Sequence, residues 1–250
     1  MPSIPVDVLR EILEHVGKSD LATLCRVNKI CCACSQDVLY REIECEDPDV
    51  IQTLAQSTDL ARRVRSFQTD CDIGELATAL QNMSSLLRLG LDRIGDPSIL
   101  DGCTFKLDSF ACDFPYSESL QKILNGQSSL TEFTIYLSAG HPPPFEETFL
   151  PNLTQVTAKP SWVRMLIPGR PVKEAMVYDP WGEDDPIDTS IFTLSTAPIR
   201  KLQITYHLLY PTPGSRLASI FHSLEHLEID AHDMNWAVRI PPLYCLFNRC

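Results

Sequence analysis

The stretch that decides the fold is Leu86–Leu91, with the sequence LLRLGL, in which apolar residues occupy the first, fourth and sixth positions. The same pattern recurs along the chain, with a small residue at the sixth position in some copies, at Val64–Thr69, Leu107–Cys112, Leu130–Ile135, Leu153–Ala158, Val172–Val177, Ile199–Ile204 and Leu224–Ile229. Side chains alternate between the two faces of a strand. Each copy therefore predicts a short strand whose fourth and sixth residues share a core.

The spacing of these copies predicts how the strands are arranged. Successive copies begin 22, 21, 23, 23, 19, 27 and 25 residues apart, and leucine-rich repeats have periods of about 20–29 residues. One such unit cannot bury its apolar face alone, so its neighbours must stack on it. We therefore expect an α/β fold, a leucine-rich-repeat solenoid with one curved parallel sheet. This architecture favours a binding surface over a catalytic pocket.

Charge and composition narrow the class of partner and the compartment. Acidic residues outnumber basic ones by 33 to 21, giving a net charge of −12, which disfavours nucleic acid or an anionic membrane as partner. No apolar run approaches the roughly 18 residues of a membrane span. The first residues also lack the basic and apolar regions of a signal peptide. We expect a cytoplasmic or nuclear protein whose ten cysteines are reduced thiols.

The first forty residues follow a different pattern from the repeats. Val8, Leu9, Ile12, Leu13 and Val16 recur at helical spacing. Two further apolar lines run through residues 21–27 and 30–39, so we expect three helices here. Three helices in so short a segment build too little core for high independent stability. Their apolar surface is therefore expected to serve partly for docking.

Three segments of this region resemble an F-box: residues 4–13 (IPVDVLREIL), 20–29 (DLATLCRVNK) and 39–41 (LYR). With the divergent repeats, they make the chain similar to the F-box/leucine-rich-repeat proteins abundant in fungi. One departure is Lys29–Cys34 (KICCAC), where small thiols replace the bulkier residues usual in the third helix. Smaller side chains fill less volume and weaken a core.

We divide the chain into four parts on these patterns. They are an F-box-like helical module at 1–43, a junction helix at 44–63, about eight repeat units at 64–235, and an irregular tail at 236–250. A solenoid normally carries an end cap that covers its last apolar face. The tail is a poor cap, which is compatible with a shortened version of a longer array.

The resemblance implies a substrate-recognition subunit of a cullin–RING (SCF-type) ubiquitin ligase. The F-box would bind the ligase adaptor subunit and through it the cullin scaffold, and the repeats would bind the target protein. Such a receptor acts by raising the effective concentration of the target, so we expect neither enzyme activity nor a cofactor. The alternative is an interaction scaffold whose degenerate F-box has no role in a ligase.

Adaptor binding is expected to use exposed apolar residues of the small helices, as in helix-in-groove recognition. The candidates, some of which must instead be internal core, are Ile4, Pro5, Val8, Leu9, Ile12, Leu21, Leu24 and Val27.

Target binding is expected at the residues that follow the strands. Asp70, Asp92 and Asp113 occupy equivalent positions and predict a stacked acidic row that could receive a basic peptide. Tyr136, Lys159 and Tyr178 continue the same position, and paired tyrosines are typical of binding hot spots. The simpler interpretations are that the acids only face water and that the rings pack on neighbouring loops.

Three weaker patterns favour ordinary surface or core residues over a metal site. Cys31–Cys34 contains a Cys-x-x-Cys, but zinc needs four ligands and no second pair follows. The spacing of His222, Glu225 and His226 requires one helix for zinc binding, whereas His226 falls in a strand pattern. The acids at 183–185 with Asp188 lack the spacing and the glycine of a calcium loop. Phosphate-loop and nucleophile-elbow motifs are absent from the sequence.

Overall fold

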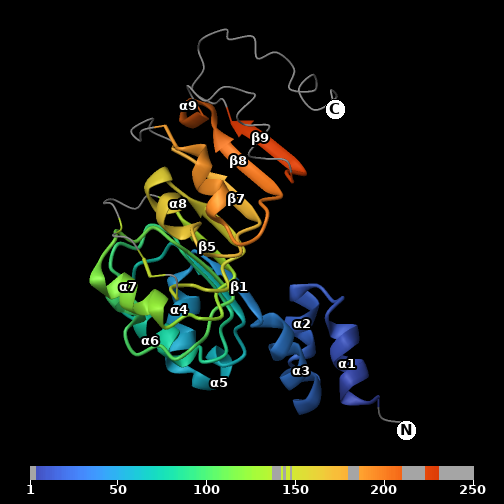
Figure 1. Ribbon diagram of the computed structural model, residues 1–250. Coiled ribbons are helices and arrows are strands. Elements are labelled where there is room, and N and C mark those ends of the chain that lie inside the picture. Colours follow the sequence, from blue (N-terminus) through green and yellow to red (C-terminus); the bar gives the residue numbers. More distant parts are fainter. Residues whose placement is uncertain are drawn as a thin grey trace. The chain divides into compact units, whose positions relative to one another are not determined.

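The computed structural model describes residues 4–136, 142, 145–146, 148–179, 186–209 and 223–230, and Figure 1 labels their helices and strands. The chain divides into two compact units, Met1–Cys112 and Asp113–Cys250. The boundary lies directly after a strand, inside the region predicted to form repeats. In both units, strands alternate with helical connections, which gives an α/β fold.

The first unit begins with α1 (Val6–Leu13), α2 (Lys18–Leu24) and α3 (Lys29–Leu39). Its strands are β1 (Glu42–Cys45), β2 (Ser66–Thr69), β3 (Arg88–Leu91) and β4 (Ser109–Cys112). The connections contain α4 (Pro48–Gln56), α5 (Thr58–Ala61), α6 (Leu76–Asn82) and the 3-10 helix η1 (Pro97–Leu100). The four strands are parallel and pair in chain order.

The second unit holds β5 (Glu132–Ile135), β6 (Gln155–Ala158), β7 (Glu174–Val177), β8 (Lys201–Thr205) and β9 (His226–Asp230). Between and before them lie α7 (Glu118–Asn125), α8 (Pro160–Leu166), the 3-10 helix η2 (Thr189–Leu194) and α9 (Tyr206–Leu209). These five strands are also parallel and pair in chain order. Parallel neighbours need a crossover connection, and the helices and extended segments supply it.

The repeated pattern correctly predicted all eight of its strands, within a residue or two at each end. Phe67 pairs with Leu89, and Leu89 pairs with Phe110, so equivalent residues of the pattern stand side by side. The anchor side chains are buried in the first seven copies, as Leu91 at 0% exposure illustrates, and half-buried in the last copy. The residues between the anchors lie on the other face of the strand. In β4 and β6, half-buried and buried residues accordingly alternate.

The junction predicted at 44–63 is wrong in one respect. Residues 42–45 form β1, an additional strand that pairs in parallel with β2. Helices α4 and α5 therefore connect two strands rather than precede the first one. The sequence concealed β1 because only Ile43 and Cys45 are apolar in it, and they alternate with glutamates.

Helical connections cover the buried side of the first unit. Helix α4 begins at Pro48 after Asp47, whose carboxylate accepts a hydrogen bond from the backbone N–H of Asp49, an N-cap of the expected kind. Its buried residues Ile51 and Leu54 lie on the face toward the core. Helix α4 contacts α6, and the two lie side by side in Figure 1. Helix α6 in turn contacts η1.

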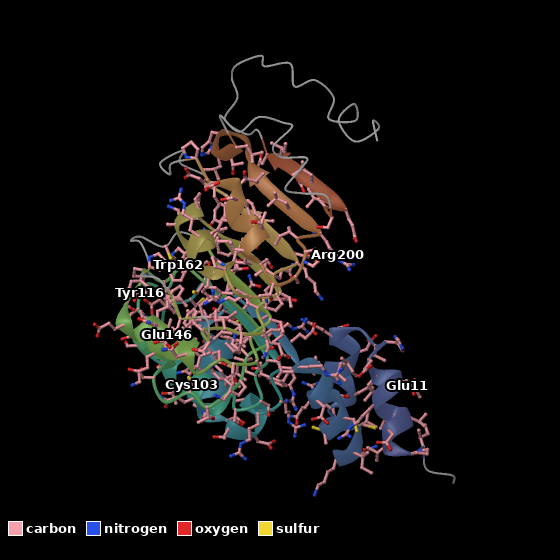
Figure 2. All side chains as sticks on the ribbon, in the orientation of Figure 1. Glu11, Cys103, Tyr116, Glu146, Trp162 and Arg200 are labelled. Atoms are coloured by element: carbon pink, nitrogen blue, oxygen red, sulfur yellow. The ribbon has the colours of Figure 1, made fainter. Side chains whose placement is uncertain are left out.

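The core of the second unit is rich in aromatic rings. Trp162 of α8 is fully buried. Its ring lies 6.1 Å from that of Tyr116 and 6.0 Å from those of Phe133 and Phe145, measured between ring centroids. Figure 2 shows Trp162 and Tyr116 close together in this cluster. Tilted and edge-to-face contacts of this kind add to the burial of apolar area.

Arg170 joins two segments of the second unit, residues 146–149 and 165–168. Its guanidinium donates from Nε to the carbonyl of Phe149 (2.7 Å), from Nη2 to that of Glu146 (2.9 Å), and from Nη1 to those of Met165 (3.1 Å) and Pro168 (2.6 Å). The side chain is 1% exposed. A buried polar group is tolerated where its donors are satisfied, as they are here.

Some predicted features lie outside the described residues, namely the tail at 236–250 and the last repeat residues, 231–235. Among the helices that the structure describes, none is long and apolar enough to cross a membrane.

Candidate interaction surfaces

The first candidate surface is on the three N-terminal helices, whose core is small. Leu13, Leu21 and Cys34 are buried at its centre. Around them pack the partly buried residues Leu9, Val16, Leu24, Val38 and Leu39. Leu21 is 1% exposed, so it is one of the candidates that belong to the internal core. Leu9 and Leu24 also belong mainly to this core.

Helix α1 carries a second apolar stripe, on the side away from this core. Val8 and Ile12 are 45% and 49% exposed, and residues four apart lie on one face of a helix. Leu9 and Leu13, one position further along, form the inward stripe. Glu11 lies on the same helix (Figure 2) and is exposed. A helix that is apolar on both sides is normally covered on both.

Other exposed apolar residues lie at the ends of the helices. Of the predicted contacts, Ile4, Pro5 and Val27 are exposed, whereas Val6 and Ile30 are exposed apolar residues that the prediction missed. Ile30 belongs to the apolar line that predicted the third helix.

Ion pairs hold the three helices and the following segment together. Arg10 of α1 contacts Asp37 of α3 at 3.2 Å (Nη2 to Oδ2), and Arg41 contacts Glu14 at 2.7 Å (Nη1 to Oε1). Arg63, after α5, donates to the carboxylate of Asp37 and also to the carbonyl of Ala33 at 3.2 Å. Two arginines thus share Asp37.

The cysteines of α3 occupy different environments, as expected for small side chains on a helix. Cys34 is buried, whereas Cys31 and Cys32 are half-buried. Cys25 lies close to Cys32, with its Sγ 3.9 Å from the carbonyl oxygen of Cys32. Burial, and then the proximity of Cys32, raises the pKa of the Cys25 thiol. Within the described residues, no group of three side chains is arranged to hold a metal ion.

The other weak metal patterns fall mostly outside the described residues. His222 and the acids at 183–185 are not described. His226 lies in β9, with Nε2 3.9 Å from Glu228 Oε2. Asp188 caps η2, accepting a hydrogen bond from the backbone N–H of Ser190.

The second candidate surface is the outward face of the strands. In the first unit, Gln68 donates from Nε2 to Asp92 Oδ2 at 3.2 Å, and Arg93 contacts Asp70 at 3.6 Å. Asp70 and Asp92 follow neighbouring strands as predicted, but each has a local polar or cationic partner. The third predicted acid, Asp113, belongs to the second unit.

Gln68 reaches Asp92 because the residue between them is glycine. A Cβ built at Gly90 would lie 3.0 Å from Gln68 Cγ, tighter than most real Cβ contacts. The glycine therefore allows the glutamine stem to lie flat across β3. This contact could not be read from the pattern, where position 90 is one of the free positions.

In the second unit, Tyr136 and Tyr178 touch. Their ring centroids are 6.1 Å apart at an interplanar angle of 67°, an edge-to-face geometry. Tyr136 is 40% exposed, whereas the hydroxyl of Tyr178 is buried and has no hydrogen-bond partner among the described residues. Burial, then Asp113, and then Tyr136 raise the pKa of Tyr178 above its usual range.

A hollow of about 200 Å³ lies beside this pair. Its lining comes from the ends of strands β5 to β9 and the residues that follow them: Tyr136, Thr157, Met176, Val177, Tyr178, Gln203, Ile204, Thr205 and Asp230. Lys159, predicted between the two tyrosines, is not among the residues that line it. Thr157, Met176 and Gln203 occupy the middle strand position, so the alternation of the pattern already placed them on this face.

A comparison with protein families agrees with the F-box resemblance of the three N-terminal helices. A family model for the F-box domain matches residues 1–42. F-box domains bind the adaptor subunit of SCF-type ubiquitin ligases, so the match indicates a role in protein interaction for this part of the chain. No curated protein matches the sequence.

Proposed function

We propose that this chain is a substrate-recognition subunit of an SCF-type cullin–RING ubiquitin ligase. Helices α1–α3 bind the adaptor subunit, and the outward face of the strands binds a protein that is to be ubiquitinated. The observation that carries the proposal is the outward stripe of Val8 and Ile12 on α1, within the segment that matches the F-box.

The strand region supports a binding role without chemistry of its own. Parallel strands with equivalent residues in register fit a divergent leucine-rich-repeat solenoid, which presents one extended surface. The receptor holds the target near the ubiquitin-charged enzyme and raises its effective concentration. On this proposal the protein works in the cytoplasm or nucleus, with protein partners rather than nucleic acid or membrane, and is not itself an enzyme.

The test is co-purification of the adaptor subunit with the full chain after co-expression. Val8→Asp and Ile12→Asp each place a charge on the outward stripe, which costs several kcal/mol if that stripe is buried by a partner. We expect adaptor recovery to fall at least tenfold while the melting temperature stays within about 2 °C of the parent, because both residues are exposed.

Leu194→Asp is the matched control. Leu194 is an exposed apolar residue of η2, outside the three helices, and the variant should recover the adaptor normally. Leu9→Asp and Leu24→Asp are less informative, because both residues pack on the core of the helices and a charge there unfolds it. Undiminished recovery with both Val8→Asp and Ile12→Asp would remove this stripe from the interface.

One observation favours a second candidate, an interaction scaffold whose F-box has lost the adaptor. The buried centre of the three helices consists of two leucines and Cys34, which is a small core. If the parent chain never recovers the adaptor while its strand region still binds other proteins, the scaffold is the better description.

A further inference from the structure

We propose that the hollow beside Tyr136 and Tyr178 receives a lysine or arginine side chain of the target protein. This inference rests on the proposed function, because it specifies the chemistry by which the strand region recognises its target.

The size of the hollow suits a single side chain. Sites for small molecules usually measure about 300–1,000 Å³, whereas this hollow measures about 200 Å³. It lies where β6, β7, β8 and β9 end, on the face that is turned away from the core. A segment of a partner that crosses these strand ends could insert one long side chain here.

The aromatic pair offers a favourable site for a cation. A lysine or arginine within about 6 Å of an aromatic ring is attracted by the negative face of the ring. Tyr178 lines the hollow and is partly exposed, although its hydroxyl oxygen is buried. Tyr136 holds its ring at 6.1 Å, edge to face, which fixes both rings before a ligand arrives.

Acidic groups around the rings favour a basic side chain over a neutral one. Asp230 lines the hollow, and Asp113 acts on Tyr178 electrostatically. Lys159, the nearest predicted cation, does not line the hollow. The net charge of −12 further attracts basic segments.

Apolar residues of the hollow also fit a long basic side chain. Of the apolar residues in the lining, Met176 is partly exposed, whereas Val177 and Ile204 are fully buried. Lysine and arginine bury their methylene stems against apolar surface, which Met176 provides. A purely aliphatic side chain could use the same residues but would leave Asp230 without a contribution to binding. The occupant can therefore be identified by removing the positive charge from the ligand or the negative charge from Asp230 and measuring binding.

The experiment uses the full chain with ¹³C-labelled methionine methyl groups and follows Met176 by NMR. The chain has five methionines, and the Met176→Leu variant identifies the signal. The probes are capped pentapeptides, Gly-Gly-X-Gly-Gly, in which X is lysine, arginine, norleucine or Nε-acetyl-lysine. We expect the lysine and arginine peptides to shift the Met176 signal saturably. The two neutral peptides should bind at least about threefold more weakly.

Two variants locate the charge. Asp230→Asn should weaken the binding of the lysine and arginine peptides by about threefold to tenfold and leave the binding of the norleucine peptide unchanged. Glu225→Gln removes the same charge at the other end of β9, where Glu225 pairs with Arg200 at 3.4 Å, and should change nothing. Equal shifts by norleucine and lysine peptides, or no shift by any peptide, overturn the proposal.

The outcome is independent of the adaptor. Asp230→Asn should still recover the adaptor subunit at the parental level, because it lies far along the chain from α1–α3. If the adaptor binds and the Met176 signal is insensitive to peptides, only the inference about the hollow fails. If the signal responds and the adaptor never binds, the ligase role fails and the hollow remains a binding site.

Discussion

Arg170 shows how a single residue organises a connection. Its four hydrogen bonds to backbone carbonyls require the planar fork of a guanidinium, which an ammonium group cannot reproduce. We expect Arg170→Lys to lower the free energy of unfolding by about 2–4 kcal/mol, measured by urea denaturation followed by circular dichroism. Arg200→Lys, at an exposed ion pair (Figure 2), should lower it by less than about 0.5 kcal/mol.

Cys103 predicts a dependence of stability on pH. Burial, and secondarily Asp101, raises the pKa of this thiol from 9.0 to about 12. Between these two values the unfolded chain releases the thiol proton first, so the contribution of Cys103 to stability is complete below about pH 9 and is lost as the pH rises toward about 12. Cys103→Ser should flatten this part of the stability curve.

The raised pKa of Cys103 can also be tested through the reactivity of its thiol. Only a thiolate reacts rapidly with iodoacetamide. At pH 9 we expect Cys103 in the folded protein to react at least on the order of a hundredfold more slowly than in urea-unfolded protein, measured by peptide mass spectrometry. Equal rates in the two states would show that the thiol is not buried and that its pKa is not raised.

At the scale of the element, β2 and β3 depend on the contact between Gly90 and Gln68. Gly90→Ala places a methyl group 3.0 Å from Gln68 Cγ and should be destabilising. With Gln68→Ala the clash disappears, and alanine is preferred over glycine in a strand by roughly 0.5–1 kcal/mol. The double-mutant cycle should therefore give a favourable coupling of at least about 0.5 kcal/mol. Additive single effects would show that the side chain moves aside freely.

The strands were predictable and the helices less so, for a physical reason. A repeated set of buried anchors leaves a periodic signal, so the positions of β2 to β9 followed from the sequence. β1 was missed because it carries only two apolar residues at the edge of the pattern. The sequence shows two apolar stripes on α1, Val8 with Ile12 and Leu9 with Leu13. Which of the two faces the core depends on how α2 and α3 pack against α1.

The candidate sites divide in the same way. Alternation placed Met176 and Gln203 on the outward face, but it could not show that Tyr136 and Tyr178 touch across β6 or that Lys159 lies outside the hollow. Those facts depend on rotamers and on the packing of rings. The partners of Asp70 and Asp92 likewise depend on side chains from neighbouring strands.

At the scale of the molecule, Arg63 couples the three helices to the strands of the first unit. It donates to Asp37 and Ala33 of α3 and to Asp59 of α5, the last at 3.2 Å. Arg63→Met keeps a long apolar stem but removes these bonds, so that of the two arginines that contact Asp37 only Arg10 remains. We expect faster amide hydrogen exchange in α1–α3, with β2–β4 unchanged.

That experiment separates a local joint from a shared core. Local opening exposes only the amides of the element that moves, and mass spectrometry resolves them by peptide. Faster exchange throughout Met1–Cys112 would instead mean that the helices and strands of this unit unfold together. Arg88→Met, which breaks an exposed ion pair with Glu42 at 3.0 Å, provides a control with little expected effect.

The strands keep their register although the segments that join them differ in length. Starts of the pattern lie as few as 19 and as many as 27 residues apart, yet Val156 still stands opposite Ala175, and Ala175 opposite Leu202. Extra residues are thus absorbed between strands. The connections are therefore natural places for inserting a fluorescent label or an affinity tag, whereas one residue added within a strand would turn every following side chain to the wrong face.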